Sequence, residues 1–195
     1  MKKKTIALIV CLTLIIGCAV GGTIAWLTDQ TAAVTNTFTA GDVDIDLTET
    51  DVENDGTLTA NSYKMVPGNE ISKDPKVTVV ADREKCYLFV KVEKVNNPDN
   101  FLDYTIDSGW TSLVDADPSD IVSTDGVYFR IVDASAVAQD FYVLAGNKVT
   151  VKNNVTKNAL DNLTESTLPQ LKFTAYACQF ANVNSEYQAW LNVQP

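Results

Sequence analysis

Residues 86–95 read CYLFVKVEKV, and this stretch predicts a strand inside a β-sheet. In an extended chain, alternate side chains point to opposite faces. One face here carries four apolar side chains: Cys86, Leu88, Val90 and Val92. Tyr87 and Phe89 make the other face apolar as well at the start of the stretch. We therefore expect this strand to be central in its sheet.

The same two-residue period recurs along the chain. Val43, Ile45 and Leu47 alternate with aspartates, which predicts a strand with one dry and one solvated face. Runs rich in β-branched and aromatic residues predict further strands at 76–80, 127–132, 141–144, 148–152 and 171–180. Gly, Pro, Asn and Asp separate these runs. The pattern predicts an all-β, antiparallel sandwich of about seven or eight strands.

Three other segments lack this period. Residues 49–60 are rich in carboxylates and predict a solvated loop, and residues 153–169 predict a crossing loop with a turn or two of helix. Ser185 and Gln188 have the spacing of a helix capping box. Tyr187, Trp190 and Leu191 follow on one helical face. We expect a short C-terminal helix against the sandwich.

The first 25 residues have the layout of an export signal. Three lysines precede an apolar run over residues 5–20, which is shorter than the roughly 20 residues of a spanning helix. Small residues before the bond between Ala25 and Trp26 predict cleavage there by a signal peptidase. An alternative is a lipid anchor, because the residues ending at Cys18 are similar to a lipobox, whose cysteine is acylated. Either way we expect the protein outside the cell.

The composition excludes several classes of function. The sequence has 15 basic and 25 acidic residues, a net charge of −10, and loss of the three lysines in residues 1–25 would leave 12 against 25, or −13. Such a surface repels nucleic acid and anionic lipid, so we expect no nucleic-acid partner and membrane contact only through the signal or a lipid anchor. The chain has no histidine, which removes the common catalytic triads and zinc sites.

The remaining motifs also point away from catalysis. Carboxylate pairs could serve a glycosidase, but acids this numerous on a small protein are typical of a solvated surface. Residues 51–56 resemble the start of a calcium loop, yet Ser62 stands where the closing acid belongs. We expect no enzyme, no cofactor and no dedicated metal site. Cys86 and Cys178 would be the cysteines left after cleavage. The sequence allows either a disulfide between them or two free thiols packed in the apolar interior.

Several stretches resemble the TasA/camelysin family of Gram-positive exported proteins, whose signals are cut by a SipW-type peptidase. They are GGTIAWLTD at 21–29, NTFTAGDVDIDLTE at 36–49, MVPG at 65–68, ISKDP at 71–75, the strand at 87–92 and TAYACQ at 174–179. The resemblance implies a jelly-roll sandwich, secretion to the cell surface or biofilm matrix, and, as in TasA-like members, assembly into fibres. The peptidase activity that the name camelysin carries is not transferred, since histidine is absent.

In such fibres the N-terminal segment of one subunit adds as a strand to the next, and residues 26–40 are the matching segment here. Four of its apolar side chains share one parity and would give a strand a partly apolar face: Trp26, Ala32, Val34 and Phe38. Beyond Gly41 the parity changes, which marks a bulge or hinge. Alone the segment buries too little to order itself, whereas an exposed sheet edge would supply hydrogen bonds and a pocket. The alternative is that it forms the first strand of its own sandwich.

We therefore expect a signal peptide at 1–25, a donor segment at 26–40 and a jelly-roll-like domain at 41–195. The function expected is that of a secreted structural protein that self-associates into a homopolymer. A monomeric or lipid-tethered surface binding module is the alternative, and a hydrolase is the least favoured reading.

Overall fold

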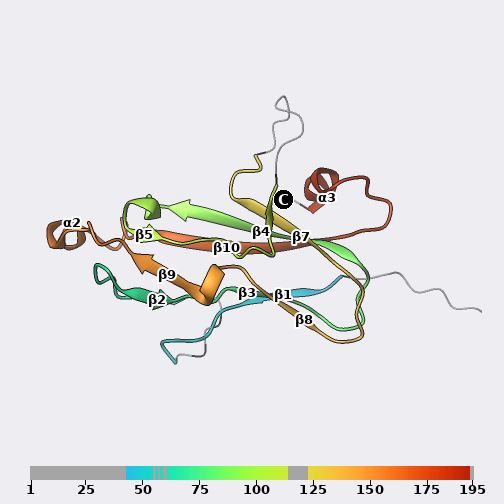
Figure 1. The fold of residues 1–195 in the computed structure, drawn as a ribbon, viewed down its shortest axis with the longest axis horizontal. Helices are drawn as coiled ribbons and strands as arrows, with labels where there is room; N and C mark the ends of the chain where they lie inside the picture. The colour runs from blue at the N-terminus through green and yellow to red at the C-terminus, as the bar shows by residue number, and fades with distance from the viewer. Residues whose placement is uncertain (1–42, 55, 57, 59–60, 114–122, 194–195) are drawn as a thin grey trace, which may run out of the picture. The chain divides into compact units, whose positions relative to one another are not determined.

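The computed structural model describes residues 43–54, 56, 58, 61–113 and 123–193. The signal, the cleavage position, Cys18 and the segment 26–40 lie outside the described residues. Contacts divide the chain between Thr39 and Ala40 into two units, and everything below concerns the second. Within that unit, two layers of antiparallel strands face one another, and a helix covers the outer face of one layer (Figure 1). The predicted all-β sandwich with a short C-terminal helix is confirmed.

One layer is a four-stranded sheet in the order β10–β4–β7–β6. Its strands are β10 (Gln170–Gln179), β4 (Cys86–Val95), β7 (Val127–Val132) and β6 (Thr111–Ser112). The register places Phe173 opposite Val92 and Cys86 opposite Val132. The strand expected from residues 86–95 has those bounds and lies inside the sheet, as predicted.

The other layer consists of two three-stranded sheets in the orders β1–β3–β8 and β2–β9–β5. Their strands are β1 (Ile45–Thr48), β3 (Lys76–Val79), β8 (Gln139–Tyr142), β2 (Glu70–Ser72), β9 (Lys148–Val151) and β5 (Leu102–Asp103). The connection from β2 to β3 stays beside the connection from β8 to β9. Lys73 N–H donates to the Asn147 carbonyl and Val143 N–H to the Pro75 carbonyl, each at 2.9 Å. Pro75 has no N–H to donate to a neighbouring strand, so the hydrogen bonding between the two sheets of this layer is interrupted at that residue.

The chain crosses between the two layers at consecutive strands. β3 pairs with β8 in one layer and β4 pairs with β7 in the other, so the chain changes layer between β3 and β4 and again between β7 and β8. β1 and β10 lie at the outer edges of their sheets, next to β3 and β4 respectively.

Two apolar clusters hold the layers together. The cluster between the layers contains Val77, Val79, Cys86, Leu88, Val90, Trp110, Val132 and Val143. The cluster on the outer face contains Tyr87, Phe89, Leu113, Val127, Ala189 and Trp190. β4 contributes to both, which is why it is apolar on both faces.

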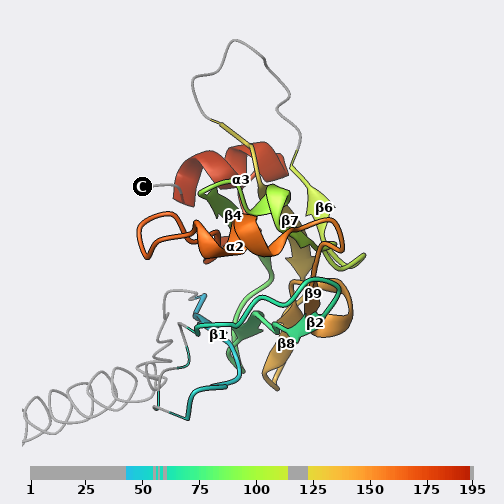
Figure 2. The same cartoon turned by 90° about the vertical axis from the view of Figure 1, so that its left-hand side faces the viewer.

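Helix α3 (Glu186–Val193) covers the outer face of the four-stranded sheet, as Figure 2 also shows. The Gln188 N–H donates to the Ser185 hydroxyl at 3.2 Å, which is the serine half of the predicted capping box, whereas the Gln188 side-chain amide donates to Asn192 at 3.4 Å. The Trp190 ring lies 5.5 Å from the Phe89 ring and 5.2 Å from the Tyr176 ring. Trp190 is therefore the residue that fixes the helix to the sheet.

The structure departs from the predicted elements in small ways. Short strands β2, β5 and β6 were not predicted, and β8 begins two residues before the predicted run at 141–144. Helix α2 (Lys157–Asp161) is the predicted helical turn within residues 153–169, and 3₁₀ turns η1 (Pro98–Asn100) and η2 (Ala145–Asn147) connect strands. A strand of two or three residues is too short to show a period.

Candidate functional site

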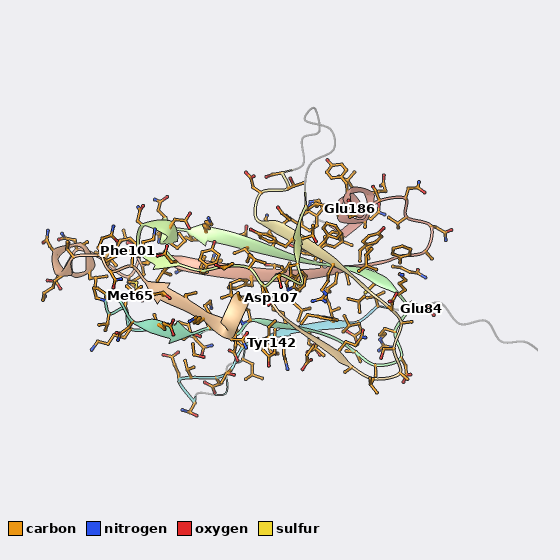
Figure 3. All side chains as sticks on the ribbon, in the orientation of Figure 1. Met65, Glu84, Phe101, Asp107, Tyr142 and Glu186 are labelled. Carbon is orange, nitrogen blue, oxygen red and sulfur yellow. The ribbon has the colours of Figure 1, made fainter. Side chains whose placement is uncertain are left out.

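One long side of the sandwich is closed by the chain between β5 and β6, which crosses from one layer to the other. Asp107 N–H donates to the Val143 carbonyl at 2.9 Å, and the Trp110 indole N–H donates to the Tyr142 carbonyl at 2.8 Å. Figure 3 labels Asp107 and Tyr142 near this crossing. The Arg130 guanidinium lies 5.5 Å from the Trp110 ring, so an aromatic and a cation seal this side.

The opposite side is bordered by β1 and β10, the outermost strands of the two layers, which lie against one another. Among the described residues, no strand pairs with the outer edge of either. In an antiparallel pair, every second residue directs its N–H and C=O away from its partner. The ten-residue β10 therefore offers hydrogen-bonding groups from about five residues to an added strand.

Burial falls from the inner strands to these two edge strands. Along β4, Val90 and Leu88 are fully buried, whereas their β10 partners Ala175 and Ala177 are only half-buried. β1 shows the same contrast with β3, since Leu47 is half-buried and its partner Val77 is fully buried. The apolar faces of both layers thus extend to a side that the described residues do not cover.

A groove of about 920 Å³ lies at this open side. Its apolar lining comes from both layers and from two loops: Ile45, Leu47, Leu58, Met65, Ile71, Leu102, Val149, Leu168, Pro169, Leu171, Phe173 and Ala175. Figure 3 labels Met65 near the ends of β2 and β9. Leu58 and Leu168 belong to the lining and are 48% and 42% exposed, so apolar surface reaches solvent at the groove.

An ion pair between Glu49 and Lys73 is set into this apolar lining. Lys73 Nζ lies 2.8 Å from Glu49 Oε1 and 3.0 Å from Oε2, and the two side chains are only 12% and 10% exposed. The Lys94–Asp99 pair, by comparison, has side chains that are 48% and 56% exposed. The Glu49–Lys73 pair is therefore shielded from water, and its geometry matters to the groove.

Two further polar side chains complete the cluster around Glu49. The Asn61 amide donates to Glu49 Oε2 at 3.3 Å and the Tyr63 hydroxyl donates to the same oxygen at 3.4 Å. Burial, followed by the charge of Glu49, raises the pKa of Tyr63 to about 12. Tyr63 is thus a neutral donor at physiological pH. We call these four residues, Glu49, Asn61, Tyr63 and Lys73, the groove cluster.

Lys73 also connects the two layers across the groove. Its Nζ lies 5.2 Å from the centroid of the Phe173 ring on β10 and 5.4 Å from that of Tyr63. Both distances are within the range of a cation–π contact. Lys73 follows β2 in one layer, and Phe173 lies on the inner face of β10 in the other. The polar cluster consequently touches both walls of an otherwise apolar groove.

The loop after β1 positions this cluster; its described residues form the predicted loop and are mostly exposed, but Glu49 at its start is half-buried. The Thr50 N–H and hydroxyl donate to the Asp74 carboxylate at 3.0 and 2.6 Å, and Val52 N–H donates to the Asn61 amide oxygen at 3.0 Å. These bonds fold the loop back against the β2–β3 connection. Glu49 is half-buried because Lys73 comes to it from that connection, a pairing across 24 residues that composition cannot reveal.

The described lining of the groove is electrically balanced on a strongly acidic protein. Among the described residues, its charged members are Glu49, Glu93, Lys73 and Lys172, two of each sign. The whole sequence carries −10. A neutral, part-polar and mostly apolar groove favours an apolar or weakly charged ligand over a basic one.

Cys86 and Cys178, the cysteines among the described residues, are both free thiols in the structure, with no disulfide between them. Cys178 lies opposite Tyr87 in the register, and side chains alternate. Cys86 therefore faces the core between the layers, whereas Cys178 packs in the cluster beneath α3. Burial raises the pKa of Cys86 to about 11, which keeps it a neutral thiol.

The described residues hold no group of three or more side chains placed to bind a metal ion. Nor does any described helix have the length and apolar character needed to span a membrane. In the loop that resembles a calcium site, Asp51 accepts from the Gly56 N–H at 2.8 Å and Glu53 from the Ser62 N–H at 3.3 Å.

Comparison with protein-family models, curated proteins and solved structures found no match.

Proposed function

We propose that this protein is an exported structural subunit of the bacterial cell surface or biofilm matrix, and that it polymerises by strand exchange. Residues 26–40 of one copy would insert into the groove of the next, between β1 and β10. The observation that carries the proposal is the groove itself, with two unpaired strand edges among the described residues and an apolar floor. Such an edge is a template for an added strand.

The length of the segment suits the groove. A strand rises about 3.3 Å per residue, so a partner for all ten residues of β10 would span about 33 Å. Residues 26–40 exceed ten residues and leave a few to connect the donor to its own domain. The domain begins its first described strand at Ile45, close behind the segment.

The chemistry of the segment also suits the groove. As a strand it directs Ala32, Val34 and Phe38 to one face, which can lie on the apolar lining. Asp29 is the one charged residue between 26 and 40, so the strand avoids most of the charge of the rest of the chain. A nearly neutral strand and a neutral groove can meet without bringing unpaired charges out of water.

The proposal is tested with the chain that starts at Trp26 and a variant lacking residues 26–39. We expect fibres from the first by electron microscopy and sedimentation, and a folded monomer from the second, with an unchanged circular dichroism spectrum. A synthetic peptide of residues 26–40 should cap growing fibres. A parent chain that remains monomeric at high concentration across salt and pH would refute strand exchange and favour a segment folded into its own sandwich.

The volume of the groove supports a second candidate, a monomeric or lipid-tethered binding module. Small-molecule sites measure about 300–1,000 Å³ and combine apolar walls with a few polar groups, as this groove does. Native mass spectrometry separates the candidates. A bound small molecule, or an acyl group on Cys18, with no polymer would favour the module.

A further inference from the structure

The groove has one polar position in an apolar surface, and this is an unusual place for charge. Glu49 and Lys73 lose most of their hydration there and are stabilised by each other, by Asn61 and by Tyr63. A shielded pair of this kind adds little to stability compared with an apolar pair of the same size. We therefore expect the pair to contribute to specificity, because it favours a polar neighbour over an apolar one.

The donor segment carries a matching pattern. The side chains that share a face at positions 32, 34, 36 and 38 are Ala, Val, Asn and Phe. Asn36 is thus a single amide between apolar neighbours, on the face that would enter the groove. Its carboxamide can donate to a carboxylate and accept from an ammonium group at the same time.

We propose that Asn36 of the incoming copy binds the groove cluster and thereby sets the register of the exchanged strand. The inference rests on the proposed strand exchange. The amide nitrogen donates to the Glu49 carboxylate and the amide oxygen accepts from the Lys73 ammonium group, while Val34 and Phe38 lie on the apolar lining to either side. Phe173, which faces Lys73, marks the corresponding position on β10.

Other registers are disfavoured for definite reasons. A slip by one residue turns the apolar face of the donor away from the groove. A slip by two places Val34 or Phe38 against the ion pair and leaves the Asn36 amide on apolar side chains without a partner. A single buried polar residue selects register in the same way in coiled coils.

The test asks whether the groove prefers Asn or Leu at position 36, and whether that preference reverses when the groove cluster is made apolar. The measurement is the critical concentration for polymerisation of the chain starting at Trp26. In the unaltered groove, N36L should raise the critical concentration about fivefold or more, since leaving a buried polar group without a partner costs at least about that factor. In a groove made apolar by E49L and K73M together, N36L should lower it or leave it unchanged. T37L, on the opposite face of the segment, is the matched control and should change the value less than about threefold.

The outcomes separate the two proposals. If polymers form and need residues 26–39, but N36L acts equally in both grooves, the register assignment is wrong and strand exchange stands. If the parent chain forms no polymer, both are wrong. Thermal unfolding checks that the E49L/K73M groove is folded. Should that variant not fold, the unaltered groove still decides, because an N36L effect no larger than that of T37L overturns the assignment.

Discussion

Lys73 shows how one charged side chain can be kept in an apolar groove. Its ammonium group has two carboxylate contacts at 2.8 and 3.0 Å and two aromatic rings within 5.4 Å. Each contact replaces part of the hydration that burial removes. Loss of any one partner therefore leaves the others to hold a charge with little access to water.

Removal of one member of this pair should destabilise the fold. We expect K73M to lower the free energy of unfolding by about 3 kcal/mol, because it leaves the shielded Glu49 carboxylate without its cationic partner. Urea denaturation measures the change. K94M is the control, since the exposed Lys94–Asp99 pair should be worth less than about 1 kcal/mol. The E49L/K73M double variant should regain much of the loss, and a double variant as unstable as K73M would contradict this account.

Tyr63 should give the protein a specific alkaline sensitivity. Its pKa is raised to about 12, so the folded state holds the phenol proton more tightly than the unfolded chain, whose tyrosine titrates near 10. The associated stability is complete below pH 10 and is lost as pH rises through 12. The urea midpoint should therefore fall less between pH 9 and pH 11 in Y63F than in the parent. Equal pH slopes in the two proteins would argue against a raised pKa of Tyr63 in the folded state.

The cysteines should react differently from one another. Cys86 is fully buried with a pKa near 11, so alkylation at pH 8 should leave it unmodified until the protein is denatured. Half-buried Cys178 should react first. Peptide mass spectrometry under non-reducing conditions measures both, and a peptide pair joined through the two cysteines would contradict their placement on opposite faces.

Among the elements, strands with a long run of alternating residues were predictable from sequence. β4 and β7 have the predicted bounds because six to ten alternating residues identify an extended chain. β2, with three residues, and β5 and β6, with two each, were missed. Their positions depend on pairing with β9 and β7, which is a tertiary effect that local sequence does not carry.

At β10, a charge on the groove face should block assembly while the domain remains folded. Ala175 lines the groove and is half-buried, so A175K would place an ammonium group where the proposed donor strand would lie. We expect at least a tenfold rise in the critical concentration and a loss of stability near 1 kcal/mol, because the long side chain can extend to solvent at the open side. V137K is the control, since Val137 is 68% exposed and lies outside the groove lining. Equal effects of the two variants would place the joint elsewhere.

At the scale of the whole molecule, sequence predicted the sandwich and proposed residues 26–40 as a donor segment, but it did not predict the groove. The groove exists because the β5–β6 crossing seals one side through Trp110, while the described residues leave the other side open. Glu49 and Tyr63 come from the long connection between β1 and β2, and Lys73 from the connection between β2 and β3, so tertiary folding alone brings the three together. The one available hint was Glu49, which ends an alternating strand and could be assigned only to a solvated loop.

Net charge should govern how readily whole molecules join. Copies with a charge of −10, or −13 after loss of residues 1–25, repel one another over about 30 Å at 0.01 M salt and only about 8 Å at 0.15 M. The groove is neutral, so this repulsion acts between subunits and not on the inserted strand. Raising the salt over that range should lower the critical concentration several-fold, measured by sedimentation. Binding of the peptide 26–40, with its single charge, to the variant lacking residues 26–39 should change little. A critical concentration that rises with salt would mean that ion pairs between subunits, and not the apolar groove, hold the polymer together.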